Sequence, residues 1–319
     1  MLKSLKRLPE LFAKHDWDSF MKERVSVYSS ECVLNIGARL AEGPHWWDER
    51  GLLVWVDIEA SRVGLFDPEQ GTNRFIDTAF HVGCVVPTSQ GNLLVATSDG
   101  FKVIDPDSGK SASLHNPIKD PLNYRFNDGK CDPFGRLWAG TLHYDFLPGA
   151  GTLWRLDHSL RSSSMIDGVT ISNGLAWSLD RTSLYYVDTP TLQVRRFPLS
   201  TSGDLIGNGD VCIEIPSDWD CAPDGMTIDR NGMLWIALWN GSAVTCWNPS
   251  NGEHLATVEL PCSQVTSCCF GGSAFDQLFI TTAKYDLDQE TQSLTPLAGG
   301  IFMAKVGVSG MPASVFCES

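Results

Sequence analysis

The chain has 319 residues, with 24 Lys and Arg against 38 Asp and Glu, which gives a formal net charge of −14. Nucleic-acid binding depends mainly on Lys and Arg that neutralise phosphates, and a net negative surface also repels anionic lipid headgroups, so the charge argues against nucleic-acid and membrane partners. Hydrophobic residues make up 43% of the chain and charged residues 19%, a composition that can bury a large core and is not typical of a disordered protein.

Residues 1–28 carry none of the repeats described below and are predicted to form an N-terminal extension, either a short helix or a tail. Five apolar residues in this segment have near-helical spacing with charged residues between them: Leu2, Leu5, Leu8, Leu11 and Phe12. The basic residues near the start are not followed by the apolar stretch of a secretion signal. A cytoplasmic location is therefore expected.

A leucine followed by apolar, aromatic or small residues recurs six times in the rest of the chain, at residues 53–57, 93–97, 137–141, 184–188, 234–238 and 278–282. Successive leucines lie 40, 44, 47, 50 and 44 residues apart. Short strands at this spacing, each preceded by turn residues, are typical of β-propeller blades, which are four-stranded antiparallel sheets. The sequence therefore predicts an all-β fold, a six-bladed β-propeller over residues 29–319. A β-sandwich would not repeat one segment at a nearly constant spacing.

A glycine precedes five of the six leucines by 8 to 10 residues, and we expect it to start the strand before the repeat strand. In a propeller that strand is the innermost one, so the residue before each glycine should lie at one mouth of the central channel. These residues, with two candidates in the sixth repeat, are Glu42, Val82, Asp128, Asn173, Asp224 and Ser267 or Cys268.

Acids and an amide occupy four of these six positions. Clustered carboxylates in a narrow channel repel one another unless a cation lies between them. Oxygen ligands from Glu, Asn and Asp suit hard divalent cations, Ca²⁺ first, with Mg²⁺ and Mn²⁺ as alternatives and Zn²⁺ also compatible. The alternative is that Asx-Gly pairs are ordinary turn residues. Glu42 is not a usual turn residue, and the shared register in separate repeats favours a site.

The third repeat is two residues shorter between its glycine and its leucine than most of the others. Either Asn127 or Asp128 could therefore face the channel. Arg125 adds a planar positive group near the acids, which suits a carboxylate-like or hydroxyl-rich substrate. The alternative for Arg125 is an ordinary salt bridge to Asp128 or Asp132.

Several common catalytic and metal-binding motifs are absent. The chain contains no GxSxG, HExxH, GxxxxGK[ST] or GxGxxG segment. Its ten cysteines lack CxxC spacing, so we expect most of them to be small buried hydrophobic residues. Two of its seven histidines, His45 and His81, lie near repeat starts and could touch a substrate, although buried structural histidines are more common.

Four segments resemble signature segments of the regucalcin/gluconolactonase family, which is also called the senescence-marker-protein or luciferin-regenerating-enzyme family. They are residues 41–44 (AEGP), 125–130 (RFNDGK), 172–175 (SNGL) and 223–226 (PDGM). The resemblance runs from about residue 30 to the end of the chain and is especially close over residues 125–141 and 266–272.

This resemblance implies a six-bladed propeller that hydrolyses sugar lactones with one divalent metal ion at the channel mouth. It places the metal ligands on Glu42, Asn173 and Asp224, and it places substrate-binding residues on Arg125 and Asn127. A further substrate-binding acid of the family matches Asp145. The pair Tyr144-Asp145 stands where regucalcin has two acids, so the sugar preference of this chain is a separate question.

The expected reaction is the opening of a small-molecule sugar lactone to an aldonic acid. The metal would polarise the carbonyl or bind the attacking water, and Asp224 is the candidate general base. Two alternatives are a phosphotriesterase-like hydrolase and a non-catalytic calcium-binding or protein-docking propeller. A pure scaffold would not need three oxygen ligands at one register. The protein is expected to be a monomer or a weak dimer.

Overall fold

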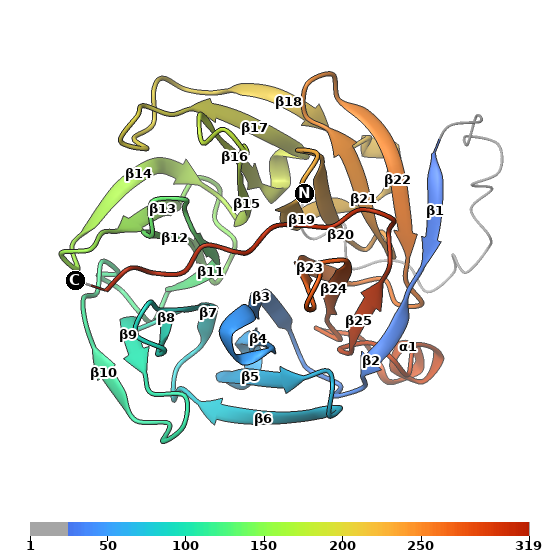
Figure 1. The fold of residues 1–319 in the computed structure, drawn as a ribbon, viewed down its shortest axis with the longest axis horizontal. Helices are drawn as coiled ribbons and strands as arrows, with labels where there is room; N and C mark the ends of the chain where they lie inside the picture. Colours follow the sequence, from blue (N-terminus) through green and yellow to red (C-terminus); the bar gives the residue numbers. More distant parts are fainter. Residues whose placement is uncertain (1–24, 319) are drawn as a thin grey trace.

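The computed structural model describes residues 25–318, which form six β-sheets arranged as blades around a central axis (Figure 1). The predicted six-bladed β-propeller is therefore confirmed. The predicted N-terminal extension lies outside the described residues up to residue 24. Among residues 25–318, no helix is both long enough and apolar enough to cross a lipid bilayer.

Each blade has four antiparallel strands, and in the first five blades the chain runs from the innermost strand outward (Figure 1). Blades one to three contain β3 (Ala41–Trp47), β4 (Leu52–Asp57), β5 (Arg62–Asp67) and β6 (Thr72–Asp77); β7 (Val82–Pro87), β8 (Leu93–Thr97), β9 (Gly100–Ile104) and β10 (Ser111–Ser113); and β11 (Tyr124–Cys131), β12 (Leu137–His143), β13 (Gly151–Leu156) and β14 (Ser162–Val169). Blades four and five contain β15 (Ser172–Trp177), β16 (Ser183–Asp188), β17 (Gln193–Pro198) and β18 (Asp210–Glu214); and β19 (Ala222–Ile228), β20 (Leu234–Trp239), β21 (Ala243–Asn248) and β22 (Glu253–Glu259).

Blade six closes the ring because it combines strands from both ends of the described chain. It contains β23 (Val265–Gly271), β24 (Gln277–Thr282), β25 (Ile301–Ala304) and, outermost, β2 (Glu31–Leu34), which pairs antiparallel with β25. The strand β1 (Ser26–Ser29) pairs in parallel with β22 and adds a fifth strand to blade five. Residues 26–28, predicted to belong to the extension, are thus part of a blade. The short helices are η3 (Asp48–Arg50), η4 (Ile58–Ala60), η5 (Thr189–Thr191), η6 (Ser217–Trp219) and α1 (Gln289–Leu294).

The hydrophobic core is divided into six clusters, one between each pair of neighbouring blades. A blade inside the ring is covered on both faces, so its central strands are apolar on both sides rather than alternating. All six repeat leucines lie on the second strand of a blade and are fully buried: Leu53, Leu93, Leu137, Leu184, Leu234 and Leu278. Seven of the ten cysteines are buried as well, as expected from the sequence.

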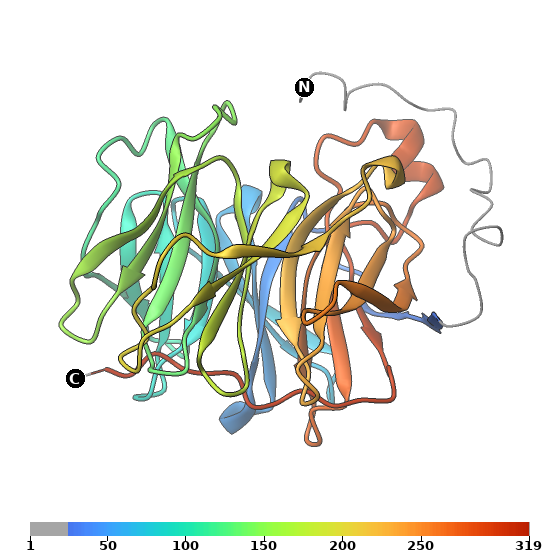
Figure 2. The same ribbon diagram turned by 90° about the horizontal axis from the view of Figure 1, so that it is seen from above.

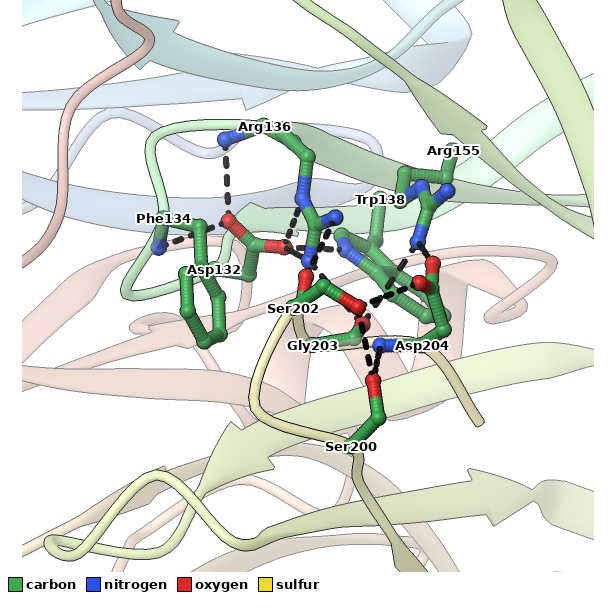
Figure 3. Close-up of polar contacts among 9 residues, drawn as sticks. All are labelled: Asp132, Phe134, Arg136, Trp138, Arg155, Ser200, Ser202, Gly203 and Asp204. Atoms are coloured by element: carbon green, nitrogen blue, oxygen red, sulfur yellow. Dashed lines mark hydrogen bonds and ion pairs between the residues drawn. The ribbon is translucent and has the colours of Figure 1, made fainter. Parts of the chain in front are cut away.

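A buried carboxylate fixes the turn between β11 and β12 (Figure 3). One oxygen of Asp132 accepts hydrogen bonds from the backbone N–H groups of Phe134 and Arg136, both at 2.9 Å. Its other oxygen accepts from Arg136 Nε at 2.7 Å and from Trp138 Nε1 at 2.8 Å. Asp229 repeats three of these four contacts in blade five, with the backbone N–H groups of Asn231 and Met233 and with Trp235 Nε1. The buried aspartate that fixes a hairpin turn therefore occurs in two blades and has a structural role.

Arg136 extends this network from blade three to blade four (Figure 3). Its guanidinium donates to the backbone carbonyls of Ser202 at 3.0 Å and Gly203 at 2.9 Å. Beside it, Arg155 donates to the Asp204 carboxylate at 2.6 Å. The loop between β17 and β18 is thus held against the neighbouring blade by charge-assisted hydrogen bonds.

The C-terminal segment, residues 305–318, crosses one face of the ring (Figures 1 and 2, dark red). Near its start, the N–H of Gly310 donates to the carbonyl of Phe275 in blade six at 2.8 Å. Near its end, the N–H of Phe316 donates to Pro87 in blade two at 2.9 Å, and that of Cys317 donates to Gly135 in blade three at 3.0 Å. The Phe316 ring is fully buried between these two blades. The segment therefore ties distant parts of the ring together.

Candidate metal and substrate site

Every innermost strand has an irregularity in its pairing with the second strand of the same blade. The shifts lie between Glu42 and His45, Val82 and Cys84, Phe126 and Gly129, Asn173 and Leu175, Pro223 and Met226, and Val265 and Ser267. An extra residue at such a bulge bends the strand and redirects a side chain. The candidate residues therefore lie within strands rather than in turns, and the strands begin before the glycines, contrary to the expectation that the glycines start them.

The glycines beside the candidate residues allow neighbouring innermost strands to approach closely. A Cβ atom on Gly174 would lie 2.7 Å from the backbone oxygen of Asp224, and one on Gly83 would lie 2.5 Å from the carbonyl carbon of Phe126. A Cβ on Gly225 would collide with the Ser267 hydroxyl. Only glycine fits where backbones approach this closely. The repeated glycine thus narrows the ring at the level of the site.

Two buried carboxylates accept a hydrogen bond from the glycine that follows them. Gly43 N donates to Glu42 Oε2 at 2.8 Å, and Gly129 N donates to Asp128 Oδ1 at 2.7 Å. Both acids are almost fully buried. These hydrogen bonds hold the two carboxylates in place beside the bulges.

Glu42 and Asp224 come from blades one and five and share a hydrogen bond between their carboxyl groups. Burial, together with the nearby charge of Asp128, raises the pKa of Glu42 to about 8. Burial and the charges of Glu42 and Asp128 raise the pKa of Asp224 well above its ordinary value. Within residues 25–318, Asp224 Oδ1 is a buried oxygen with no hydrogen-bond partner. In the metal-free protein the raised pKa values favour a protonated Glu42–Asp224 pair, and Asp224 Oδ1 is an acceptor that no donor uses.

A chain of hydrogen bonds connects the remaining candidates around the channel. Arg125 Nη1 donates to Asn127 Oδ1 at 2.7 Å, and Asn127 Nδ2 donates to Asn173 Oδ1 at 3.0 Å. Asn173 Nδ2 in turn donates to Thr189 Oγ1 at 2.8 Å, and that hydroxyl donates to the Pro223 carbonyl at 2.8 Å. The structure therefore brings Arg125, Asn127 and Asn173 together and connects them to the strand that carries Asp224.

Arg125 is buried, and burial lowers its pKa despite the negative charge of the groups around it. Among the described residues it forms no ion pair with Asp128 or Asp132; the carboxylate of Asp132 is taken by Arg136. The predicted salt-bridge alternative is therefore wrong. Burial is the largest effect on the pKa of Arg125, the charge of Glu59 opposes it most strongly, and Tyr144 and Tyr285 also lie near the guanidinium. The sequence analysis identifies Tyr144 only as the neighbour of Asp145, and it misses Glu59 and Tyr285 because they lie outside the repeated segments.

Asp145 is the one predicted site residue that the structure does not bring to the others. Its side chain is 82% exposed, and its nearest charged partner is His143 Nδ1 at 3.9 Å. The preceding residue, Tyr144, is half-buried instead, and its hydroxyl lies 3.0 Å from His81 Nδ1. A role for Asp145 in substrate binding stays a prediction.

The residues present fit a hard divalent cation in their chemistry. Two carboxylates and an amide supply oxygen donors, Asp224 has a buried oxygen without a partner, and a cation would relieve the repulsion between Glu42 and Asp224. Within residues 25–318, no three His, Cys, Asp or Glu side chains form a group that could hold a metal. The predicted set has only two acids, and its third donor is the amide of Asn173.

Comparison with known proteins agrees with this architecture. Residues 40–284 match the family described as "SMP-30/Gluconolactonase/LRE-like region". The chain is 36% identical over 282 residues to a Bacillus subtilis protein, YvrE, provisionally named a sugar lactone lactonase, with 88% of this chain and 96% of YvrE covered. It is also 36% identical to regucalcin from Danio rerio, covering 90% of this chain and 98% of that protein.

The solved structures give the same result. Regucalcin from Agrobacterium tumefaciens, described as a calcium-binding protein, superposes with a TM-score of 0.88 at 25% identity, covering 92% of this chain and 99% of that one. A luciferin-regenerating enzyme superposes with a TM-score of 0.84 at 28% identity, covering 91% and 99%. With the matched family region spanning most of the propeller, the chain belongs to the SMP-30/gluconolactonase/LRE-like family.

Proposed function

We propose that this protein hydrolyses a sugar lactone to the corresponding aldonic acid and that it does so with one divalent metal ion. The observation that carries the proposal is the buried, partnerless Oδ1 of Asp224 beside the Glu42 carboxyl, next to the hydrogen-bonded row of Arg125, Asn127 and Asn173. Membership of a family named after gluconolactonase, and a relative provisionally named a sugar lactone lactonase, support the same reaction.

Glu42, Asn173 and Asp224 would hold the metal, with Ca²⁺ as the first candidate because all donors are oxygens. When bound, such an ion supplies Lewis-acid polarisation of the ester carbonyl. Arg125 and Asn127 lie beside the ligands and would orient the hydroxyl groups of the sugar ring. The Arg125–Asn127 hydrogen bond of 2.7 Å fixes the two side chains relative to each other before a substrate arrives.

Asp224 would take the proton of the attacking water. Its unpaired Oδ1 is the acceptor available for that proton, and the charge of a bound cation would keep the carboxylate ionised and able to act as a base. Glu42 lies next to Asp224 and would be ionised as a metal ligand. Water attack at the carbonyl carbon then opens the ring and leaves a carboxylic acid and an alcohol.

A lactone panel tests the proposal. Protein stripped of metal with a chelator and then reconstituted with Ca²⁺, Mg²⁺, Mn²⁺ or Zn²⁺ is assayed by proton release against aldonolactones, with phosphotriesters as the competing class. We expect hydrolysis of at least one aldonolactone that disappears on stripping and returns on reconstitution. Metal-dependent thermal stabilisation without hydrolysis of any lactone would instead support a calcium-binding scaffold, and preferential turnover of phosphotriesters would support the other hydrolase class.

The raised pKa values predict how stability and metal affinity depend on pH. Between about pH 4.5 and pH 8 the folded, metal-free protein keeps a proton on Glu42 that the unfolded chain has lost. The free energy of unfolding of the metal-free protein therefore falls as pH rises through this window, by about 1.4 kcal/mol for each pH unit and each proton. A cation needs ionised ligands, so its affinity rises over the same window.

Thermal unfolding at several pH values between 5.5 and 8, with chelator and with Ca²⁺, measures both effects. We expect the Tm difference between the two conditions to grow with pH. The other titrating groups of the protein contribute equally to both series and cancel in this difference. A calcium-induced increase in Tm that is the same at pH 5.5 and pH 8 would contradict the assignment of Glu42 and Asp224 as protonated ligands.

A further inference from the structure

Two loops of neighbouring blades meet beside Arg125 through a histidine and a tyrosine. His81 precedes β7 of blade two, and Tyr144 follows β12 of blade three. The Tyr144 hydroxyl lies 3.0 Å from His81 Nδ1, and the two rings meet edge to face with centroids 5.7 Å apart. Ser98 N donates to the His81 carbonyl at 2.8 Å, which fixes the backbone of this loop. The backbone of His81 and one nitrogen of its ring are thus both fixed by hydrogen bonds.

The hydrogen bonds around Tyr144 determine which nitrogen of His81 carries the proton. The Ser98 hydroxyl also forms a hydrogen bond with the Tyr144 phenol and can act as its donor. The single phenol proton is then free to donate to His81 Nδ1. Burial and the positive charges of Arg125 and Arg39 outweigh Glu59 and lower the His81 pKa, which favours the neutral ring; with the phenol as donor to Nδ1, the ring proton lies on Nε2.

His81 lies immediately before the innermost strand of blade two, on the same rim as Arg125. Among residues 25–318, Nδ1 is the His81 ring atom with a hydrogen-bond partner. His81 directly precedes Val82, the apolar residue that blade two presents where blades one, three, four and five present acids or amides. The charge of Arg125 acts on both His81 and Tyr144, which places the pair beside the substrate-orienting residues. Asp145, in contrast, faces solvent.

We infer that His81 is a specificity-determining residue that donates its Nε2–H to a hydroxyl group of the lactone ring, and that Tyr144 is the positioning residue that fixes its tautomer and orientation. The inference rests on the proposed lactonase function and deepens it. It assigns the substrate class as polyhydroxylated lactones, since an unsubstituted ring offers His81 no acceptor. Neither residue is a predicted metal ligand.

Two substrates of equal ring size separate this role from a structural one. D-glucono-δ-lactone carries the hydroxyl groups, and δ-valerolactone lacks them. We expect Tyr144→Phe and His81→Leu to lower kcat/KM for the gluconolactone by about three- to tenfold, mainly through KM, which is the effect of losing one hydrogen bond to an uncharged partner. Activity on δ-valerolactone should stay within about twofold. His81→Gln, whose amide can still donate, should retain more gluconolactone activity than His81→Leu.

Equal losses on both lactones in Tyr144→Phe and His81→Leu would overturn the inference, because they would show a general structural role. Unchanged kinetics on the gluconolactone would overturn it as well. Calorimetric binding of gluconate and of 5-hydroxyvalerate to the metal-loaded protein separates this result from failure of the proposed function. If the parent hydrolyses no lactone, the lactonase proposal fails; selective loss of gluconate binding in His81→Leu still supports the His81 contact, and unchanged or absent gluconate binding overturns it.

Discussion

The substitution Asp224→Asn is expected to lower kcat for lactone hydrolysis by about 10²- to 10⁴-fold, the usual effect of losing a general base. Asparagine keeps the size of the side chain and one oxygen donor but cannot accept the proton of the attacking water. The buried carboxyl has a raised pKa because its environment opposes a negative charge. We therefore expect the metal-free variant to be as stable as the parent or more stable, as is common when a functional charge is removed from a buried site.

Steady-state kinetics and calorimetric titration of Ca²⁺ on the same samples separate loss of the base from loss of the metal. Asp128→Asn is the matched control, because Asp128 is a buried acid at the same register of blade three. It removes the same charge without removing a predicted ligand, so a much smaller change in kcat is expected. An Asp224→Asn variant that binds Ca²⁺ and turns over as fast as the parent would remove Asp224 as the base.

The substitution Asp132→Ala is expected to lower the free energy of unfolding by about 3–5 kcal/mol. Asp132 is fully buried, and its two oxygens accept four hydrogen bonds, one of them from Arg136 Nε at 2.7 Å. Alanine would leave the Arg136 guanidinium and the Trp138 indole N–H without their partner in the interior. It would also loosen the contact of Arg136 with blade four, which depends on the orientation of the guanidinium (Figure 3).

Guanidinium-induced unfolding monitored by tryptophan fluorescence measures this loss. Asp204→Ala is the control, since the Asp204 side chain is 51% exposed and pairs with Arg155 at 2.6 Å. Exposed ion pairs contribute about 0–1 kcal/mol. The loss of unfolding free energy in Asp132→Ala should therefore be severalfold larger than the loss in Asp204→Ala. A loss below 1 kcal/mol in Asp132→Ala would show that the buried network contributes little to the stability of the ring.

The blade count and the ring position of the candidates could be predicted from the sequence because both follow from a repeat. Each repeat leucine marks the second strand of a blade, and the residue before each upstream glycine marks the innermost strand. The repeat therefore converts a position in the chain into a position around the axis. This is sufficient to bring Glu42 near Asp224 although 182 residues separate them in the chain.

Features outside the repeat could not be predicted in the same way. The pairing of β2 with β25 joins two segments that share no motif, and the parallel β1 strand depends on the free edge of β22. The choice between Tyr144 and Asp145 is made by the backbone of a loop, which turns one side chain toward His81 and the next toward solvent. In an irregular loop the direction of each side chain does not follow a fixed period, so it cannot be predicted from residue spacing.

The C-terminal segment constrains sequence changes more strongly in the loops of one rim of the propeller than in those of the rim that carries the site. It pairs with the hairpin turns that follow β7 and β11, at the ends of those strands remote from His81 and Arg125. Insertions in those turns would have to preserve backbone pairing with a segment more than 150 residues away in the chain. Within residues 25–318, this C-terminal segment makes no backbone hydrogen bond to loops of the other rim, where long-range pairing instead joins the segment before β3 to residues 283–299. The site-rim loops that carry His81 and Tyr144 can therefore change without disturbing the C-terminal segment, which ties blades two, three and six together at the opposite rim.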